Sequence, residues 1–221
     1  MIDRLVNIFG SFAKALEIVC LLEDTKPVVR QGFYENELPR IKRFCGANNL
    51  SIQTSPYKVV IVDAKEGEYS NKGVKAKLND ERKGMIFAYI SKDEENAVLA
   101  NYHELKNNHA QLGNILGYPK CCVEFFAKNQ PERSAADNDY IVPMLTNTDG
   151  NSFPFYNNIL LRNQDISLLS HFPCSLNCSA SAELGKKYLS AVRKHDSALA
   201  EQIASKLKGH HRIFRRILKF V

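Results

Sequence analysis

The stretch "LGYPKCCVEFF", residues 116–126, joins the end of one predicted helix to the start of another. Glycine favours the left-handed backbone that closes a helix, so the first helix should end at Gly117. Proline fits the first turn of a helix, because its missing N–H needs no partner there. The sequence therefore predicts a new helix from Pro119, with Cys121 and Cys122 in its first turn.

A second stretch, "HFPCSLNCSAS", residues 171–181, has the same arrangement. Pro173 predicts the start of a long helix, and on a helix Cys174 and Cys178 share one face. The free N–H groups at a helix N-terminus stabilise negative charge. They can lower the pKa of a thiol from ~8.5 to roughly 3.5–7.5. Both stretches therefore predict cysteines in the thiolate form.

The segments on either side predict an α+β fold, in which a small mixed α/β unit precedes a mostly helical part that bears the cysteines. Apolar periodicity and β-branched runs indicate the elements. Helices are expected at 3–22 and 37–46, strands at 58–64 and 83–91, a turn at "YSNKG" (69–73), and a helix from a capping box at 91–94 to residue 117. The apolar stripe of that last helix begins with Val98, Tyr102 and Leu105. The expected divisions are 1–91, 92–205 and 206–221.

The composition is that of a soluble globular protein, with 44% hydrophobic and 24% charged residues among 221. The N-terminal helix carries charges at Asp3, Arg4, Lys14 and Glu17, which favours an amphipathic helix over a signal peptide or a membrane span. A cytoplasmic, reducing location is therefore expected, where disulfides are rare and cysteines more often bind metals or react. The chain has no P-loop, dinucleotide-binding fingerprint or G-x-S-x-G elbow.

The cysteines of the two proline-led stretches form a candidate metal site. Three or four thiolates with one histidine suit zinc or an iron–sulfur cluster, and the candidate ligands are Cys121, Cys122, Cys174, Cys178 and His171. Adjacent cysteines lie about 100° apart around a helix, so one of Cys121 and Cys122 is enough. The spacing matches neither the C-x-x-C pairs of zinc fingers nor the ferredoxin run, so the metal stays open. Three ligands would leave a position for a substrate, in sulfur transfer or in chemistry on a nucleotide or RNA.

Two alternatives to a metal remain open. In a metal-free thiol enzyme, Cys174 is the nucleophile, His171 is the base, and Cys178 or Cys122 is the resolving thiol. In the other alternative the cysteines simply pack as small hydrophobes. Packing is the expected role of Cys20 and Cys45, which lie outside both stretches.

The positive charge of the chain is concentrated at its C-terminal end. No acidic residue follows Glu201, and the whole net charge of +6 comes from Lys206, Lys208, Arg212, Arg215, Arg216 and Lys219. Apolar residues between them predict a basic amphipathic helix over 206–221. Such a helix can simply dock on the core, or it can bind RNA phosphates, an acidic protein or a membrane surface. A non-catalytic RNA-binding or adaptor protein that uses this helix is therefore a further alternative.

Taken together, "LGYPKCCVEFF" and "HFPCSLNC" resemble domain-of-unknown-function family 483. The stretches "GFYENELPRIK", "YSNKG" and "RKGMIFAYISKDEENA" resemble the N-terminal part of that family. The resemblance implies an archaeal-type cytoplasmic protein and no established activity. Its sulfur motifs fall on Tyr118, Pro119, Cys121, Cys122, His171, Pro173, Cys174 and Cys178. The segment after residue 205 lies outside the resemblance.

Overall fold

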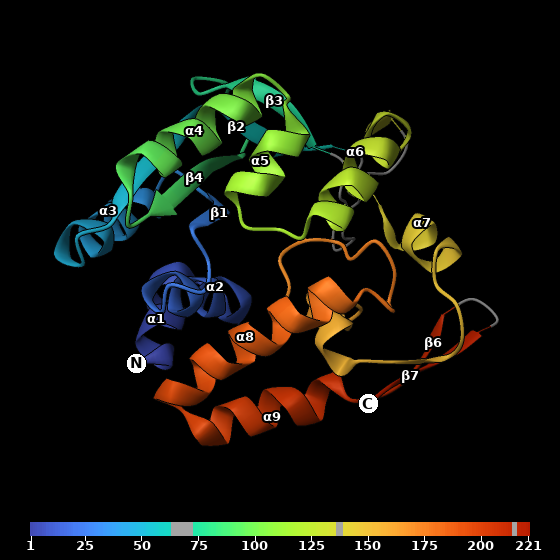
Figure 1. The fold of residues 1–221 in the computed structure, drawn as a ribbon. Helices are drawn as coiled ribbons and strands as arrows, with labels where there is room; N and C mark the ends of the chain where they lie inside the picture. Colours follow the sequence, from blue (N-terminus) through green and yellow to red (C-terminus); the bar gives the residue numbers. More distant parts are fainter. Residues whose placement is uncertain (63–72, 136–138, 214–215) are drawn as a thin grey trace. The chain divides into compact units, whose positions relative to one another are not determined.

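The computed structural model describes residues 1–62, 73–135, 139–213 and 216–221 (Figure 1). It has an α+β fold with a sheet in its N-terminal part and a mostly helical C-terminal part. The chain forms two compact units. The sheet unit contains residues 27–117 and 127–140, and the cysteine unit contains residues 1–26, 118–126 and 141–221. The chain passes between them more than once. The division into 1–91, 92–205 and 206–221 stays a prediction from the sequence.

The sheet unit is built on four antiparallel strands in the order β1-β4-β2-β3. The strands are β1 (Val28–Phe33), β2 (Ser51–Ile61), β3 (Gly73–Lys77) and β4 (Met85–Ser91). The predicted strand at 83–91 is confirmed as β4, and the run expected at 58–64 is the end of the longer β2. Helix α3 (Leu38–Ala47) is also confirmed. The expected turn at 69–73 lies outside the described residues except for Gly73.

Two helices replace the single helix predicted between residues 91 and 117. Helix α4 (Glu94–Leu105) lies over the sheet and is followed by α5 (His109–Ile115) (Figure 1). The chain turns between them at Asn107, whose φ is 53°, and the Asn108 side chain caps α5 by accepting from the N–H of Gln111. Gly117 has a φ of 76°, so its predicted role as a helix stop is confirmed. A Cβ there would also lie 2.7 Å from Cδ of Pro27.

The buried face of α4 differs from the predicted apolar stripe. Val98, Tyr102 and Leu105 are exposed, whereas Ala97, Ala100 and Glu104 are buried. The two alanines let the helix backbone approach the sheet closely, and the Glu104 carboxylate is paired with Arg30. Small side chains and one neutralised charge therefore form the contact face that periodicity assigned to the larger apolar residues.

The cysteine unit packs helices around its own core. Its longer helices are α1 (Ile2–Phe9), α2 (Phe12–Leu22), α8 (Ser179–His195) and α9 (Ser197–Leu207), and α8 and α9 lie side by side in Figure 1. The shorter elements are the first turns of α6 (Lys120–Ala135), α7 (Ile141–Thr146), η1 (Phe155–Asn157) and η2 (Arg162–Gln164). Gly185 allows α8 to approach η1, because a Cβ there would lie 3.0 Å from Cβ of Tyr156.

The predicted helix at 3–22 is interrupted at Gly10, which has a φ of 74°. The Ser11 side chain then caps α2, and the Asp165 carboxylate accepts hydrogen bonds from the Ser11 hydroxyl and the Phe12 N–H, both at 2.5 Å. Within the described ranges, no single helix is long and apolar enough to cross a bilayer. Helices α1 and α2 meet that criterion only as a pair, bent by 119° at the break between them.

The C-terminal segment is a β-hairpin, so the predicted basic helix over 206–221 is wrong. Strand β6 (Gly209–Ile213) pairs antiparallel with β7 (Arg216–Phe220), and β7 pairs in parallel with β5 (Ser152–Phe153). Leu218 and Phe220 alternate along β7 and are buried. The backbone N–H of Lys219 donates to Asn151. This contact with a distant segment favours a strand over the helix that local periodicity predicted.

Candidate metal centre

Four cysteine sulfurs converge in the cysteine unit. The Sγ atoms of Cys121, Cys122, Cys174 and Cys178 all lie within 4.8 Å of one another. Cys178 Sγ is 3.6 Å from both Cys121 Sγ and Cys122 Sγ, and the last two are 3.9 Å apart. The expectation that the two proline-led stretches bring their sulfurs together is therefore confirmed. Both adjacent cysteines face the same centre, which resolves the choice that the sequence left open.

The first pair is held by the start of α6. The Pro119 carbonyl accepts hydrogen bonds from the N–H groups of Cys122 and Val123, at 2.9 and 3.0 Å. Both cysteines therefore lie in the first turn of a helix, as predicted from Pro119. Cys122 is buried, whereas Cys121 is exposed, so the centre has an inner and an outer side.

The second pair is held by a loop and not by the predicted helix from Pro173. Helix α8 begins at Ser179, and Cys178 is its N-cap residue, with Sγ accepting the N–H of Ser181 at 3.4 Å. The N–H of Cys174 donates to Cys122 Sγ at 3.3 Å, and the N–H of Leu176 donates to Thr148 Oγ1 at 3.0 Å. A helix from Pro173 would bond the N–H of Leu176 to the carbonyl four residues back, so its donation to Thr148 accompanies a loop and not a helical turn.

Asn157 of η1 fixes the course of this loop. Its Nδ2 donates to the carbonyls of Leu176 and Cys178, at 3.0 and 2.9 Å, and the residue is fully buried. The amide thus satisfies two backbone acceptors next to the second pair of sulfurs. Nothing in the local sequence pattern marks Asn157, because its partners are about twenty residues away.

His171 lies beside the four sulfurs and is not part of the cluster that they form. Its Nε2 is 2.9 Å from Ser181 Oγ, and its ring packs 4.9 Å from the ring of Tyr118, measured between centroids. Ser181 Oγ is in turn 3.1 Å from Cys122 Sγ. His171, which the sequence offered as a ligand or base, therefore reaches the sulfurs through Ser181. Sequence reasoning missed Ser181, a small residue within a run of serine and alanine.

A family model described as a protein of unknown function, DUF483, matches residues 96–208. The match covers more than half of the chain and contains both proline-led stretches with their four cysteines. The chain belongs to domain-of-unknown-function family 483. No curated protein and no solved structure matches the chain. The family 483 match contains the whole candidate centre and ends before the hairpin of β6 and β7.

The thiol groups of the family 483 centre differ in acidity. The pKa of Cys178 is lowered to about 4, first by the hydrogen bond from Cys122 and then by Ser181, against the effect of burial. The same contact and burial raise the pKa of Cys122, while burial and the nearby Cys178 raise the pKa of Cys174 to about 12. These contacts favour a thiolate at Cys178 and oppose one at Cys122 and Cys174, because sulfurs in contact oppose one another's ionisation.

A buried cation lies in the same unit, in contact with residues next to the centre. Lys26 is fully buried, with Nζ 3.2 Å from Oε2 of Glu17 and 2.9 Å from Oγ of Ser170. Its Nζ is also 4.8 Å from the centre of the Tyr118 ring. Burial alone would lower the pKa of Lys26, but the interactions with Tyr118 and Glu17 raise it overall. Burial, followed by the charges of Lys26 and Arg162, lowers the pKa of His171 to about 3, so the imidazole is neutral at pH 7.

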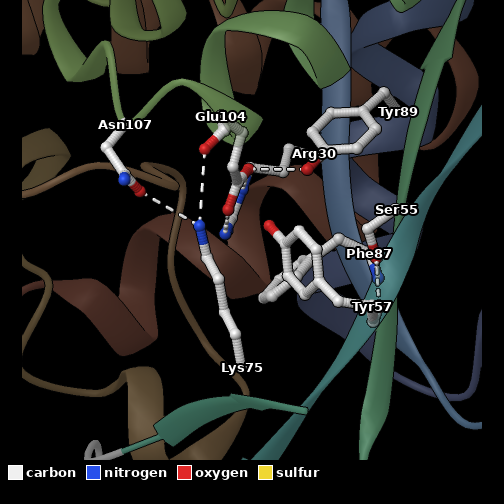
Figure 2. Close-up of polar contacts among 8 residues, drawn as sticks. All are labelled: Arg30, Ser55, Tyr57, Lys75, Phe87, Tyr89, Glu104 and Asn107. Atoms are coloured by element: carbon white, nitrogen blue, oxygen red, sulfur yellow. Dashed lines mark hydrogen bonds and ion pairs between the residues drawn. The ribbon is translucent and has the colours of Figure 1, made fainter. Parts of the chain in front are cut away.

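The sheet unit contains a separate polar cluster that holds α4 on the sheet (Figure 2). The Arg30 guanidinium binds both carboxylate oxygens of Glu104, and the Tyr89 hydroxyl donates to Glu104 at 2.8 Å. Lys75 Nζ donates to Oδ1 of Asn107 at 3.0 Å. Glu104 and Asn107 lie in the range matched by family 483, whereas the strand residues of the cluster precede it.

Proposed function

We propose that the cysteine unit binds one zinc-type metal ion through Cys121, Cys122, Cys174 and Cys178. The supporting observation is the spacing of the sulfurs, since three of their separations are 3.6, 3.6 and 3.9 Å. A zinc–sulfur bond of about 2.3 Å places the corners of a tetrahedron about 3.8 Å apart. The sulfurs thus have the spacing needed around a single tetrahedral ion.

This spacing favours a single ion over an iron–sulfur cluster. In a cluster the cysteines are distributed over several iron atoms, which spreads their sulfurs more widely than one ion does. All four sulfurs here lie within 4.8 Å of one another. Zinc is the usual occupant of a tetrahedral site with four thiolates.

The ligand set also favours a stabilising role for the ion. Four protein ligands complete a tetrahedral coordination shell, as in structural zinc sites, whereas catalytic sites keep a position for water or substrate. The ion would tie the first turn of α6 to the loop before α8. Because ligands from separate segments meet only in the folded chain, binding adds to folding stability.

Elemental analysis of protein purified without oxygen tests this proposal. We expect close to one zinc per chain, and Co²⁺ exchanged into the site should give the intense visible bands of tetrahedral thiolate coordination. The Cys174→Ser and Cys178→Ser variants should lose the metal, while Cys45→Ala, which changes a buried cysteine outside the four, should keep it. Protein that is purified without metal, or whose melting temperature is the same before and after treatment with a chelator, would contradict the proposal.

The metal-free thiol enzyme has less support from the contacts. Cys174 lies in the loop before α8 and not at a helix start. Burial raises the pKa of its thiol to about 12, and the Nε2 of His171 is bonded to Ser181. A nucleophile needs a lowered pKa or a base within hydrogen-bond reach. Sulfur-transfer or nucleotide chemistry at an open metal position likewise lacks support from the four-sulfur geometry.

The sequence predicts that the C-terminal segment binds RNA or an acidic protein partner. In the structure this segment is a hairpin. Its register pairs His210 with Lys219, and both residues are exposed. Several nucleic-acid-binding proteins present a two-stranded ribbon to their target. We keep RNA binding by this segment as a second proposal.

A further inference from the structure

The four sulfurs differ in their hydrogen bonds. Cys122 Sγ lies 3.1 Å from Ser181 Oγ and accepts the N–H of Cys174 at 3.3 Å, and Cys178 Sγ accepts the N–H of Ser181 at 3.4 Å. Both sulfurs are buried. Such donors stabilise the negative charge on a thiolate and make it a poorer nucleophile. One side of the centre is therefore both enclosed and electrostatically shielded.

Cys121 is on the opposite, outer side. Cys121 is exposed. Its sulfur lies within hydrogen-bond range of the sulfurs of Cys122 and Cys178. Among the described residues, no N–H or O–H group donates to it. Cys174 Sγ also lacks such a donor in the described part of the chain, but this residue is half-buried. Cys121 alone among the four thus combines an unshielded sulfur with an exposed position.

We propose that Cys121 is the reactive sulfur of the centre and accepts an alkyl group from a soft carbon electrophile. This inference rests on the proposed metal site, because the metal keeps the sulfur in its thiolate form at neutral pH. A thiolate is the nucleophilic form of cysteine. The chemical class of substrate is a carbon atom that bears a good leaving group.

The reaction is a displacement with no change in oxidation state. A lone pair of Cys121 Sγ forms a bond to the carbon atom, and the bond between that carbon and the leaving group breaks. The leaving group departs with the electron pair, and no proton or external electron is required. The product is a neutral thioether, which binds a metal more weakly than a thiolate does and removes one negative charge from the centre.

Alkylation of the metal-loaded, full-length protein by iodoacetamide tests the inference. The metal is quantified first, and modified peptides are then mapped by mass spectrometry as a function of time. We expect the first adduct on Cys121, at least tenfold faster than on Cys122, Cys174 or Cys178. The Cys121→Ser variant should lose this fast phase, and Cys45→Ala should retain it. The map of the unchanged protein decides the result even where the serine variant folds poorly.

The possible outcomes separate the two proposals. Bound metal with a first adduct on another cysteine, or with equal rates at all four, would overturn the role of Cys121 and leave the metal site intact. Protein that binds no metal would reject the metal site itself. A fast adduct on Cys121 in such metal-free protein would assign the reactivity to a free thiol and would also overturn the inference as stated.

Discussion

The hydroxyl oxygen of Ser181 lies 3.1 Å from the sulfur of Cys122. The N–H of the same serine donates to the sulfur of Cys178 at 3.4 Å. One residue in the first turn of α8 therefore orients a sulfur from each proline-led stretch. Partners of metal ligands often contribute as much as 10–100-fold to metal affinity, which makes Ser181 the first residue to test.

Substitution Ser181→Ala should weaken metal binding by roughly 10–100-fold, because Cys122 loses a hydrogen-bond partner within the buried centre. Competition with a chromophoric chelator measures the affinity, and circular dichroism verifies the fold. Ser179→Ala is the matched control, since Ser179 is exposed in the same helical turn. Equal affinities for the two variants would rule out a positioning role for Ser181.

Substitution His171→Phe should weaken metal binding less than Ser181→Ala does. The neutral imidazole can donate from Nε2 to Ser181, which leaves the serine hydroxyl free to donate to Cys122. Because both residues act along one chain of hydrogen bonds, the double variant should lose no more affinity than Ser181→Ala alone. The chelator competition measures all three variants, and additive losses would show that His171 acts independently of Ser181.

Substitution Glu104→Gln should destabilise the sheet unit by roughly 3 kcal/mol at pH 7, because it leaves Arg30 without its buried countercharge. Burial alone would raise the pKa of Glu104, but Arg30 and Tyr89 lower it overall. The carboxylate therefore stabilises the fold above its unfolded pKa of ~4.3, and this contribution is lost as the pH falls through the lower folded value.

Urea denaturation at pH 7 and pH 3 measures this effect. The difference in unfolding free energy between the wild type and Glu104→Gln should shrink at the lower pH. Glu201→Gln is the control, since it removes an exposed ion pair with Arg193 and should have little effect. A difference of the same size at both pH values would contradict the assignment of a charged Glu104.

The RNA prediction calls for charge substitutions within residues 206–221. Deleting 206–221 would also remove the buried Leu207, Leu218 and Phe220, so a loss of binding could reflect a loss of folding.

Glutamine in place of Arg212, Arg215, Arg216 and Lys219 should instead reduce the salt dependence of single-stranded RNA binding, by roughly 0.7 in the log–log slope for each phosphate contact. Filter binding at several salt concentrations measures it. Glutamine at the exposed Lys186 and Lys187 of α8 is the control, and an unchanged slope in the hairpin variant would reject the prediction.

Local sequence was sufficient for elements whose ends depend on neighbouring residues. Gly117 and Pro119 marked one helix end and one helix start, because left-handed backbone and a missing N–H act within a single turn. The same reasoning placed Cys121 and Cys122 in the first turn of α6. It also pointed to the candidate ligand types, since sulfur chemistry follows from residue identity, and it expected Cys20 and Cys45 to be buried, as they are.

Tertiary structure determined the path of the chain where hydrogen-bond partners far along the sequence replaced the local ones. The N–H of Leu176 is bonded to Thr148 and not to the carbonyl four residues back, so the proline at 173 begins a loop, although its local signal equals that of Pro119. Strand β5 likewise turns the basic end of the chain into a hairpin. Residue types thus determined which chemistry the chain carries, and backbone partners far along the chain determined where each sulfur and each charge lies.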